Sequence, residues 1–250
     1  MFDVIIQGPI DNDTLEEFYN DMDFNVIDKV IYSDCNNVIT LKKEKLRVLT
    51  HIDPGQNVGD YKKPLNINRF LTGIKNSLSE SSTDNVLIVR SDIKFSLELL
   101  LNNLDYNKLN VLDVTTKKFW LKPKWQYHFC DWLYFGKKSK IEMMINSTDY
   151  NMLPAVFDDS LYPCSPEYIL TYNYLKSNNL LSSKILNSVH IIFSEAINLK
   201  SKKKEYNEIP FGINKVYGIE KTDIKNMGPT NWTKSIFYSI LLKVKAKIIC

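Results

Sequence analysis

The sequence predicts an α/β fold built on a mostly parallel sheet. Three apolar segments near the amino end, at residues 2–6, 29–32 and 46–52, read as strands, and each ends in polar or turn-forming residues. A fourth, at residues 86–89, is apolar without interruption, which is typical of a strand buried on both faces. Helix-length stretches separate some of these strands, and this alternation indicates parallel strands joined by helices.

Local signals in the first half delimit each element. The first strand stops at QGP, residues 7–9, where the glycine lets the backbone pass close to a neighbour and the proline bars a helix. Asn12 or Asp13 can cap the helix that follows, which runs to about residue 21. After a loop at 56–65, we expect a helix over 66–78, a strand within 84–93, a helix near 97–104 and a strand at 111–115.

The second half is rich in aromatic residues between positions 117 and 135. Half-buried strands would explain this composition, and so would a surface on which sugar rings stack; core packing accounts for most of these side chains. SPE at 165–167 is a strong helix start. We expect strands at 131–136 and 188–193, helices at 139–146 and 165–178, and a solvated loop at 199–204, while 205–227 has no clear pattern.

Composition and charge narrow the class of protein. The chain of 250 residues is 44% hydrophobic and 24% charged, which is ordinary for a soluble protein, and we expect neither a signal peptide nor a membrane span. Residues 200–250 carry 11 lysines and 4 acidic residues, a net +7, whereas the remainder carries −4. An acidic body with a basic end is unlike a nucleic-acid binder and fits a protein that meets an anionic membrane with one end.

Cysteine and histidine placement offers no metal motif. The four cysteines are widely spread with no CxxC pair, so we expect reduced, cytosolic thiols and no zinc site. His51, His128 and His190 lack metal spacing and are expected to be structural. The sequence also lacks a GxSxG elbow, a P-loop and a GxGxxG, which counts against hydrolase, kinase and dehydrogenase functions.

The buried strand within 84–93 ends in Arg90-Ser91-Asp92, so two charges fall at the carboxyl edge of the sheet, where open α/β sheets bind ligands. A buried charge there is costly unless it is paired or bound to a ligand. One interpretation is that Arg90 holds a phosphate and Asp92 a cation. The alternative is that the two residues pair with each other or with neighbours and end the strand. Other strand ends and one helix start add Gln7, Asp34, Asp53, Asn68 and Arg69.

Six sequence blocks occur in an order that resembles a known family. They are VIIQGPI at the start, DPG at 53–55, NINR at 66–69, VRSDI at 89–93, DWLYFG at 131–136 and SPE at 165–167. Over roughly residues 1–175 they resemble the WavE family of lipopolysaccharide-synthesis proteins. Because that family is similar to GT-A glycosyltransferases, the resemblance implies a GT-A-like fold, in which a Rossmann-type nucleotide-binding half is fused to an acceptor-binding half.

The same resemblance implies an activity and a site. The expected enzyme is a glycosyltransferase that moves a sugar from a nucleotide-sugar to a surface glycan such as lipopolysaccharide, lipooligosaccharide or capsule. Asp131 and Glu167 are the candidates for the general base that inverting transfer needs. The positions that the resemblance assigns to the donor are Gln7, Gly8, Pro9, Asp34, Asp53, Asn68, Arg69, Arg90 and Asp92.

The resemblance also implies a divalent cation, Mn²⁺ or Mg²⁺, with Asp92 as its ligand. The first Asp of the family's Asp-x-Asp motif is Arg90 in this sequence, so Arg90 could pair with a phosphate beside the ion or could replace the ion. Two other functions stay open. The chain could transfer a phosphate-linked non-sugar group onto a glycan, or could be a non-catalytic scaffold of this fold in glycan assembly.

The expected organisation is one domain over residues 1–231, with a nucleotide-sugar half at 1–116 and an acceptor half at 117–231. Residues 232–250 form a basic amphipathic helix by their spacing, and this helix either lies on an anionic membrane surface or packs on the body. The expected partners are a nucleotide-sugar and a glycan or lipid-linked glycan, with no nucleic acid. The expected location is cytoplasmic, with peripheral attachment to the inner face of the cytoplasmic membrane as a further prediction.

Overall fold

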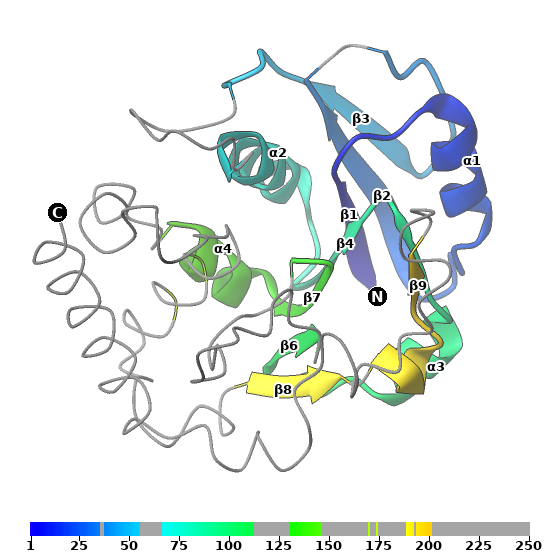
Figure 1. Cartoon of the computed structure of the whole chain (residues 1–250), viewed down its shortest axis with the longest axis vertical. Coiled ribbons are helices and arrows are strands. Elements are labelled where there is room, and N and C mark those ends of the chain that lie inside the picture. The colour runs from blue at the N-terminus through cyan, green and yellow to red at the C-terminus, as the bar shows by residue number, and fades with distance from the viewer. Residues whose placement is uncertain are drawn as a thin grey trace, which may run out of the picture.

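A computed structural model describes residues 1–35, 38–55, 67–112, 131–146, 170, 174, 189–192 and 194–201. Its centre is one seven-stranded sheet in the order β3-β2-β1-β4-β7-β6-β8 (Figure 1). The strands are β1 (Phe2–Gln7), β2 (Ile27–Asp34), β3 (Leu46–Thr50), β4 (Asn85–Arg90), β6 (Leu109–Leu112), β7 (Leu133–Lys137) and β8 (Val189–Ile192). Within this sheet as described, only β7 runs antiparallel to its neighbours. The predicted Rossmann-type α/β fold with a mostly parallel sheet is therefore confirmed.

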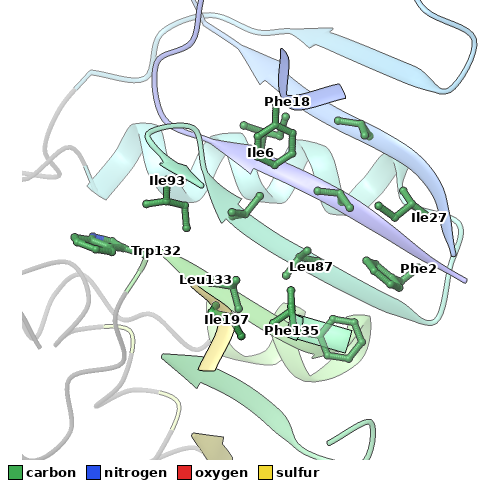
Figure 2. Packing of buried hydrophobic residues seen from close by; sticks show 14 of the residues in the cluster. Phe2, Ile6, Phe18, Ile27, Leu87, Ile93, Trp132, Leu133, Phe135 and Ile197 are labelled. Atoms are coloured by element: carbon green, nitrogen blue, oxygen red, sulfur yellow. The ribbon is translucent and has the colours of Figure 1, made fainter. Parts of the chain in front are cut away.

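Helices cover both faces of the sheet, as Figure 1 shows. Helices α2 (Ile67–Glu80) and α4 (Lys138–Asn146) bury their apolar side chains against one face. Helices α1 (Asn12–Asn20) and α3 (Leu97–Asn102), with the short helix η2 (Ser194–Ile197), cover the other. Figure 2 shows this second layer, where Phe18 of α1 packs over Ile6 and where Leu87 and Leu133 come from neighbouring strands. Burial on both faces explains the uninterrupted apolar run of β4.

The point between β1 and β4 is where successive strands begin to be added to the opposite side of the sheet. From β1 the chain continues through α1 to β2 and β3 on one side of the sheet, whereas β4 leads to β6, β7 and β8 on the other. The last residues of the two strands, Gln7 and Arg90, are register partners. Because the flanking loops leave such a point in opposite directions, it is the place at which open α/β sheets bind ligands. The antiparallel direction of β7 brings its first residues to the same edge.

Three local predictions need correction. The N-cap of α1 is Asp11, which accepts a hydrogen bond from the Thr14 amide at 2.7 Å, because the Asn12 amide oxygen instead accepts from the amides of Thr40 and Leu41. The strand expected at 131–136 begins two residues later, after a turn at 131–132. Lys200 belongs to a short strand, β9 (Lys200–Ser201), rather than to a solvated loop; it pairs with β5 (Ile93–Lys94), whose backbone groups thereby find partners.

Several predictions fall outside the described residues. These are the aromatic stretch before residue 131, Glu167 with most of its expected helix, the unassigned segment 205–227 and the helix at 232–250. Of the aromatic segment, Trp132, Tyr134 and Phe135 are described, and all three are buried in the core, as expected for most of them. Across the part of the chain that the structure describes, no helix combines the length and the apolar character needed to cross a bilayer.

Candidate functional site

The residues at the end of β4 form a compact charged cluster. The Arg90 guanidinium donates to both oxygens of Asp92, with Nε–Oδ1 at 2.9 Å and Nη2–Oδ2 at 2.5 Å. Its Nη1 lies 3.5 Å from Oδ1 of Asp131, and the guanidinium sits over the Trp132 ring at 5.3 Å from the centroid. About a fifth of the Arg90 and Asp92 side chains is exposed, so the cluster is reachable from solvent. We name Arg90, Asp92, Asp131 and Trp132 the β4-end cluster.

The turn after β1 packs directly on this cluster. Gly8 has a φ of +93°, and a Cβ at this position would lie 3.1 Å from the Ser91 hydroxyl. That hydroxyl donates to the Pro9 carbonyl at 2.7 Å, and the Ser91 amide donates to the Gln7 carbonyl at 2.8 Å. The Gln7 side-chain amide donates to the main-chain carbonyl of Asp131. The sequence-predicted residues Gln7, Gly8, Pro9, Arg90, Asp92 and Asp131 are therefore brought together at one place.

This donor set does not fit the divalent cation that the resemblance implies. Both oxygens of Asp92 already accept from the guanidinium, and that guanidinium lies between the Asp92 and Asp131 carboxylates. An ion on Asp92 would face the guanidinium at close range, where a divalent and a unit charge about 4 Å apart repel by about 8 kcal/mol in surroundings of intermediate polarity. Nor do three carboxylate, imidazole or thiol side chains converge to hold a metal ion anywhere among the described residues.

A second ion pair lies at the same edge, beyond the ends of β2 and β3. Arg69, in the first turn of α2 beside Asn68, donates to Asp53 through Nε at 2.8 Å and also through Nη2. The Gly55 amide adds a hydrogen bond of 3.0 Å to the Asp53 carboxylate. These partners, the Arg69 hydrogen bond above all, hold the pKa of Asp53 at about 2. Partial burial and the nearby Asp53 carboxylate raise the pKa of the Cys35 thiol.

Asp34 anchors the segment that follows β2. Its Oδ2 accepts from the amides of Val38 and Ile39, at 2.8 and 3.1 Å, and its side chain is 1% exposed. Alternation along β2 explains this placement: Ile31 packs with α2, whereas Tyr32 packs with α1, so Asp34 falls on the α1 face. The contacts of Asp34 seen here are those of a loop anchor. A role at the base or ribose of a nucleotide stays a prediction.

Sequence reasoning missed a pair on the α2 face of the same edge. The Ser33 hydroxyl lies 2.9 Å from Nδ1 of His51, while the buried Nε2 of that ring has no hydrogen-bond partner among the described residues. The sequence predicts a structural histidine here, but within the described residues only one of its two ring nitrogens has a hydrogen-bond partner. The signal that could have found Ser33 is alternation, since Ile31 and Ser33 occupy successive positions on one side of β2.

Arginine usage singles out both ion pairs. Only three of the 32 basic residues are arginines, and two of these, Arg69 and Arg90, make two-point contacts with an aspartate at the carboxyl edge. A lysine ammonium is a point charge and cannot form this fork, so in a chain that otherwise relies on lysine the guanidinium shape is what these positions require. This bias in arginine usage is visible in the sequence alone.

Comparison with known proteins adds little to this description. No protein-family model matches the sequence, and neither does any curated protein. Among solved structures, the fold is similar to the 2-C-methyl-D-erythritol 4-phosphate cytidylyltransferase of Francisella tularensis, with a TM-score of 0.43 and 10% identity over 84% of this chain and 94% of that one. At this distance the similarity assigns no activity, and a functional assignment has to rest on the residues of the chain itself.

Proposed function

We propose that the chain is a glycosyltransferase that takes a sugar from a nucleotide-sugar and passes it to a surface glycan. The observation that carries this proposal is the β4-end cluster at the point between β1 and β4 where the strand order reverses. Ligands of open α/β sheets bind at this point, and a guanidinium there is suited to the oxygens of a diphosphate. The six sequence blocks that resemble the WavE family, five of which include residues at this edge, support a sugar-transfer chemistry.

In this proposal each side of the edge has its own task. The guanidinium of Arg90 binds the diphosphate, and the turn at Gln7, Gly8 and Pro9 lets the donor approach the backbone closely. The Asp53–Arg69 pair, at the start of α2, lies on the side of β2 and β3, where the nucleoside would extend. Asp131 is held against Arg90 and so lies where the sugar would meet its acceptor, which makes it the candidate base among the described residues.

A nucleotide panel tests the proposal. Unfolding temperatures of the full chain are measured with uridine, guanosine, cytidine, adenosine and thymidine diphosphates and with the corresponding nucleotide-sugars. A ligand that binds only the native state raises the unfolding temperature by mass action, so at least one nucleotide should stabilise the wild type and fail to stabilise Arg90→Ala. Mass spectrometry of the stabilising donor then separates sugar transfer from transfer of another phosphate-linked group. A chain that no nucleotide stabilises would be the scaffold instead.

A further inference from the structure

We infer that the Arg90 guanidinium is the resident cation of this site and takes the place of a divalent metal ion. The inference rests on the proposed function for the identity of the ligand, a diphosphate, but the position of the cation follows from geometry alone. It also changes the role of Asp92, which becomes a positioning residue for Arg90 rather than a metal ligand. Trp132 then shares that positioning role, while Asp131, the candidate base, contacts the same guanidinium.

The first step of the argument is the location of the positive charge. The guanidinium contacts two carboxylates from separate parts of the chain, Asp92 two residues further on and Asp131 before β7. A cation that bridges two acidic side chains is the arrangement expected of a bound metal ion, and here a side chain of the protein provides it. The two acids outweigh the charge of Arg90 by one formal unit, so contact with a diphosphate depends on the N–H donors that Arg90 does not use on Asp92.

The second step is rigidity. The hydrogen bonds to Asp92 and the stacking on Trp132 fix the guanidinium on two sides, and Trp132 itself is 5% exposed. The Arg90 amide also donates to the Trp132 carbonyl at 3.0 Å, which ties the strand end to the same partner. A positive charge held in this way is ready before the ligand arrives, so it can serve a diphosphate as an immobilised ion would.

The third step is exclusion. A metal ion would need the Asp92 oxygens that the guanidinium occupies, and it would be repelled by the charge beside it. Removing the guanidinium should reverse both effects. The carboxylates of Asp92 and Asp131 would then lose the guanidinium that they share, so Arg90→Ala should gain affinity for a divalent ion.

The direct experiment measures Mn²⁺ binding from the electron paramagnetic resonance signal of the free ion, with the full chain and no nucleotide. Arg90→Ala should bind Mn²⁺ at least tenfold more tightly than the wild type, and adding Asp92→Asn should abolish the gain. Arg47→Ala removes an exposed arginine of β3 and is the matched control, which should behave as the wild type. If Arg90→Ala does not fold, Arg90→Gln takes its place, and thermal unfolding monitors both.

Two results of this experiment would overturn the inference. One is wild-type binding of Mn²⁺ that Asp92→Asn weakens tenfold, because Asp92 would then be a metal ligand. The other is a folded Arg90 variant with no gain in affinity. Neither result depends on a nucleotide, so this arm decides the position of the cation whatever the activity of the protein.

A second arm adds the ligand. The affinity for the best nucleoside diphosphate of the panel is measured by calorimetry with excess EDTA and then with Mn²⁺. Equal affinities, together with a loss of at least tenfold in Arg90→Ala but not in Arg47→Ala, are expected. A gain of more than threefold on adding Mn²⁺ overturns the inference and leaves the proposed function standing. If no nucleotide binds under either condition, the proposed function fails and the Mn²⁺ arm alone decides.

Discussion

Arg90 pairs with Asp92 through two hydrogen bonds, of 2.9 and 2.5 Å, with only Ser91 between them in the chain. Such a two-point contact fixes the plane of the guanidinium as well as its position. The fork needs Nε and Nη2 together, and a lysine ammonium offers no equivalent. This relationship makes the shape of the side chain, in addition to its charge, a testable property of the site.

Replacing Arg90 by Lys is expected to reduce donor turnover nearly as much as replacing it by Ala. Both variants lose the fork on Asp92 that fixes the guanidinium, and with it the remaining N–H donors that would contact the diphosphate. Loss of such a contact typically costs about 10²–10³-fold in rate. Asp92→Asn should lower turnover by a similar factor because it releases the guanidinium. Release of nucleoside diphosphate from the donor identified in the panel is the measurement, with circular dichroism as the folding control. Turnover within a few-fold of the wild type in all three variants contradicts the assignment.

The stability that the Asp53–Arg69 pair contributes should decrease at acid pH. The pKa of Asp53 is about 2 in the folded protein against an ordinary value of 3.8, so the pair stabilises the fold fully above about pH 4 and loses this effect as the pH falls towards 2. The difference in unfolding temperature between wild type and Asp53→Asn should therefore be constant above pH 4 and shrink below it. A difference that does not change between pH 4 and pH 2 would show that the pair does not form in solution.

Gly8→Ala should destabilise the protein by about 1–3 kcal/mol. A φ of +93° is strained for any residue with a Cβ, and that Cβ would press on the Ser91 hydroxyl at 3.1 Å. Gly73→Ala is the matched control, since Gly73 lies inside α2 with nothing within 4 Å of an added Cβ. There the substitution should stabilise by up to about 1 kcal/mol, because alanine is the better helix former. Urea unfolding measures both, and equal effects would contradict the account of the turn.

Asp34→Ala should lower stability without abolishing nucleotide binding. It removes the acceptor of the Val38 and Ile39 amides, and since Val38 is exposed, water can replace part of what is lost. The expected cost is about 0.5–1.5 kcal/mol for each hydrogen bond lost. The same variant is informative for the site, because Asp34 was also predicted to lie at the base or ribose. A loss of affinity of tenfold or more, measured by calorimetry well below the unfolding temperature, would place Asp34 at the ligand after all.

The basic end of the chain, at residues 232–250, gives a prediction that does not depend on the described residues. Its lysines flank an apolar face at helical spacing, and each lysine near an anionic surface adds roughly 1 kcal/mol. The full chain should therefore sediment with anionic vesicles at low salt and dissociate as salt rises, and a chain lacking 232–250 should remain folded in solution. If the shortened chain unfolds, or if the full chain ignores anionic vesicles, the helix belongs to the core.

Sequence patterns were sufficient to predict the mostly parallel sheet and to place Arg90 and Asp92 of the candidate site. The uninterrupted apolar run of β4 and the polar residues that follow it place Arg90 and Asp92 at the carboxyl edge without further information. Alternation along β2 also predicts that Ser33 and Asp34 lie on opposite faces of the sheet. The direction of β7 could not be predicted from the sequence, because the residues of that strand do not show whether it pairs parallel or antiparallel with its neighbours. Only the assembled sheet shows that Asp131 comes to lie against Arg90.

The contacts that hold the turn after β1 against the end of β4 join distant parts of the chain, with Gln7 and Asp131 separated by 124 residues and Ser91 and Pro9 by 82. Contacts of this kind form late in folding, because closing a long loop costs entropy before the contact can repay it. A chain that has formed its helices but has not paired β1 with β4 therefore lacks the ligand-binding site. Any ligand of this edge recognises the native state alone, so its presence in the cell would also determine how long the protein stays folded.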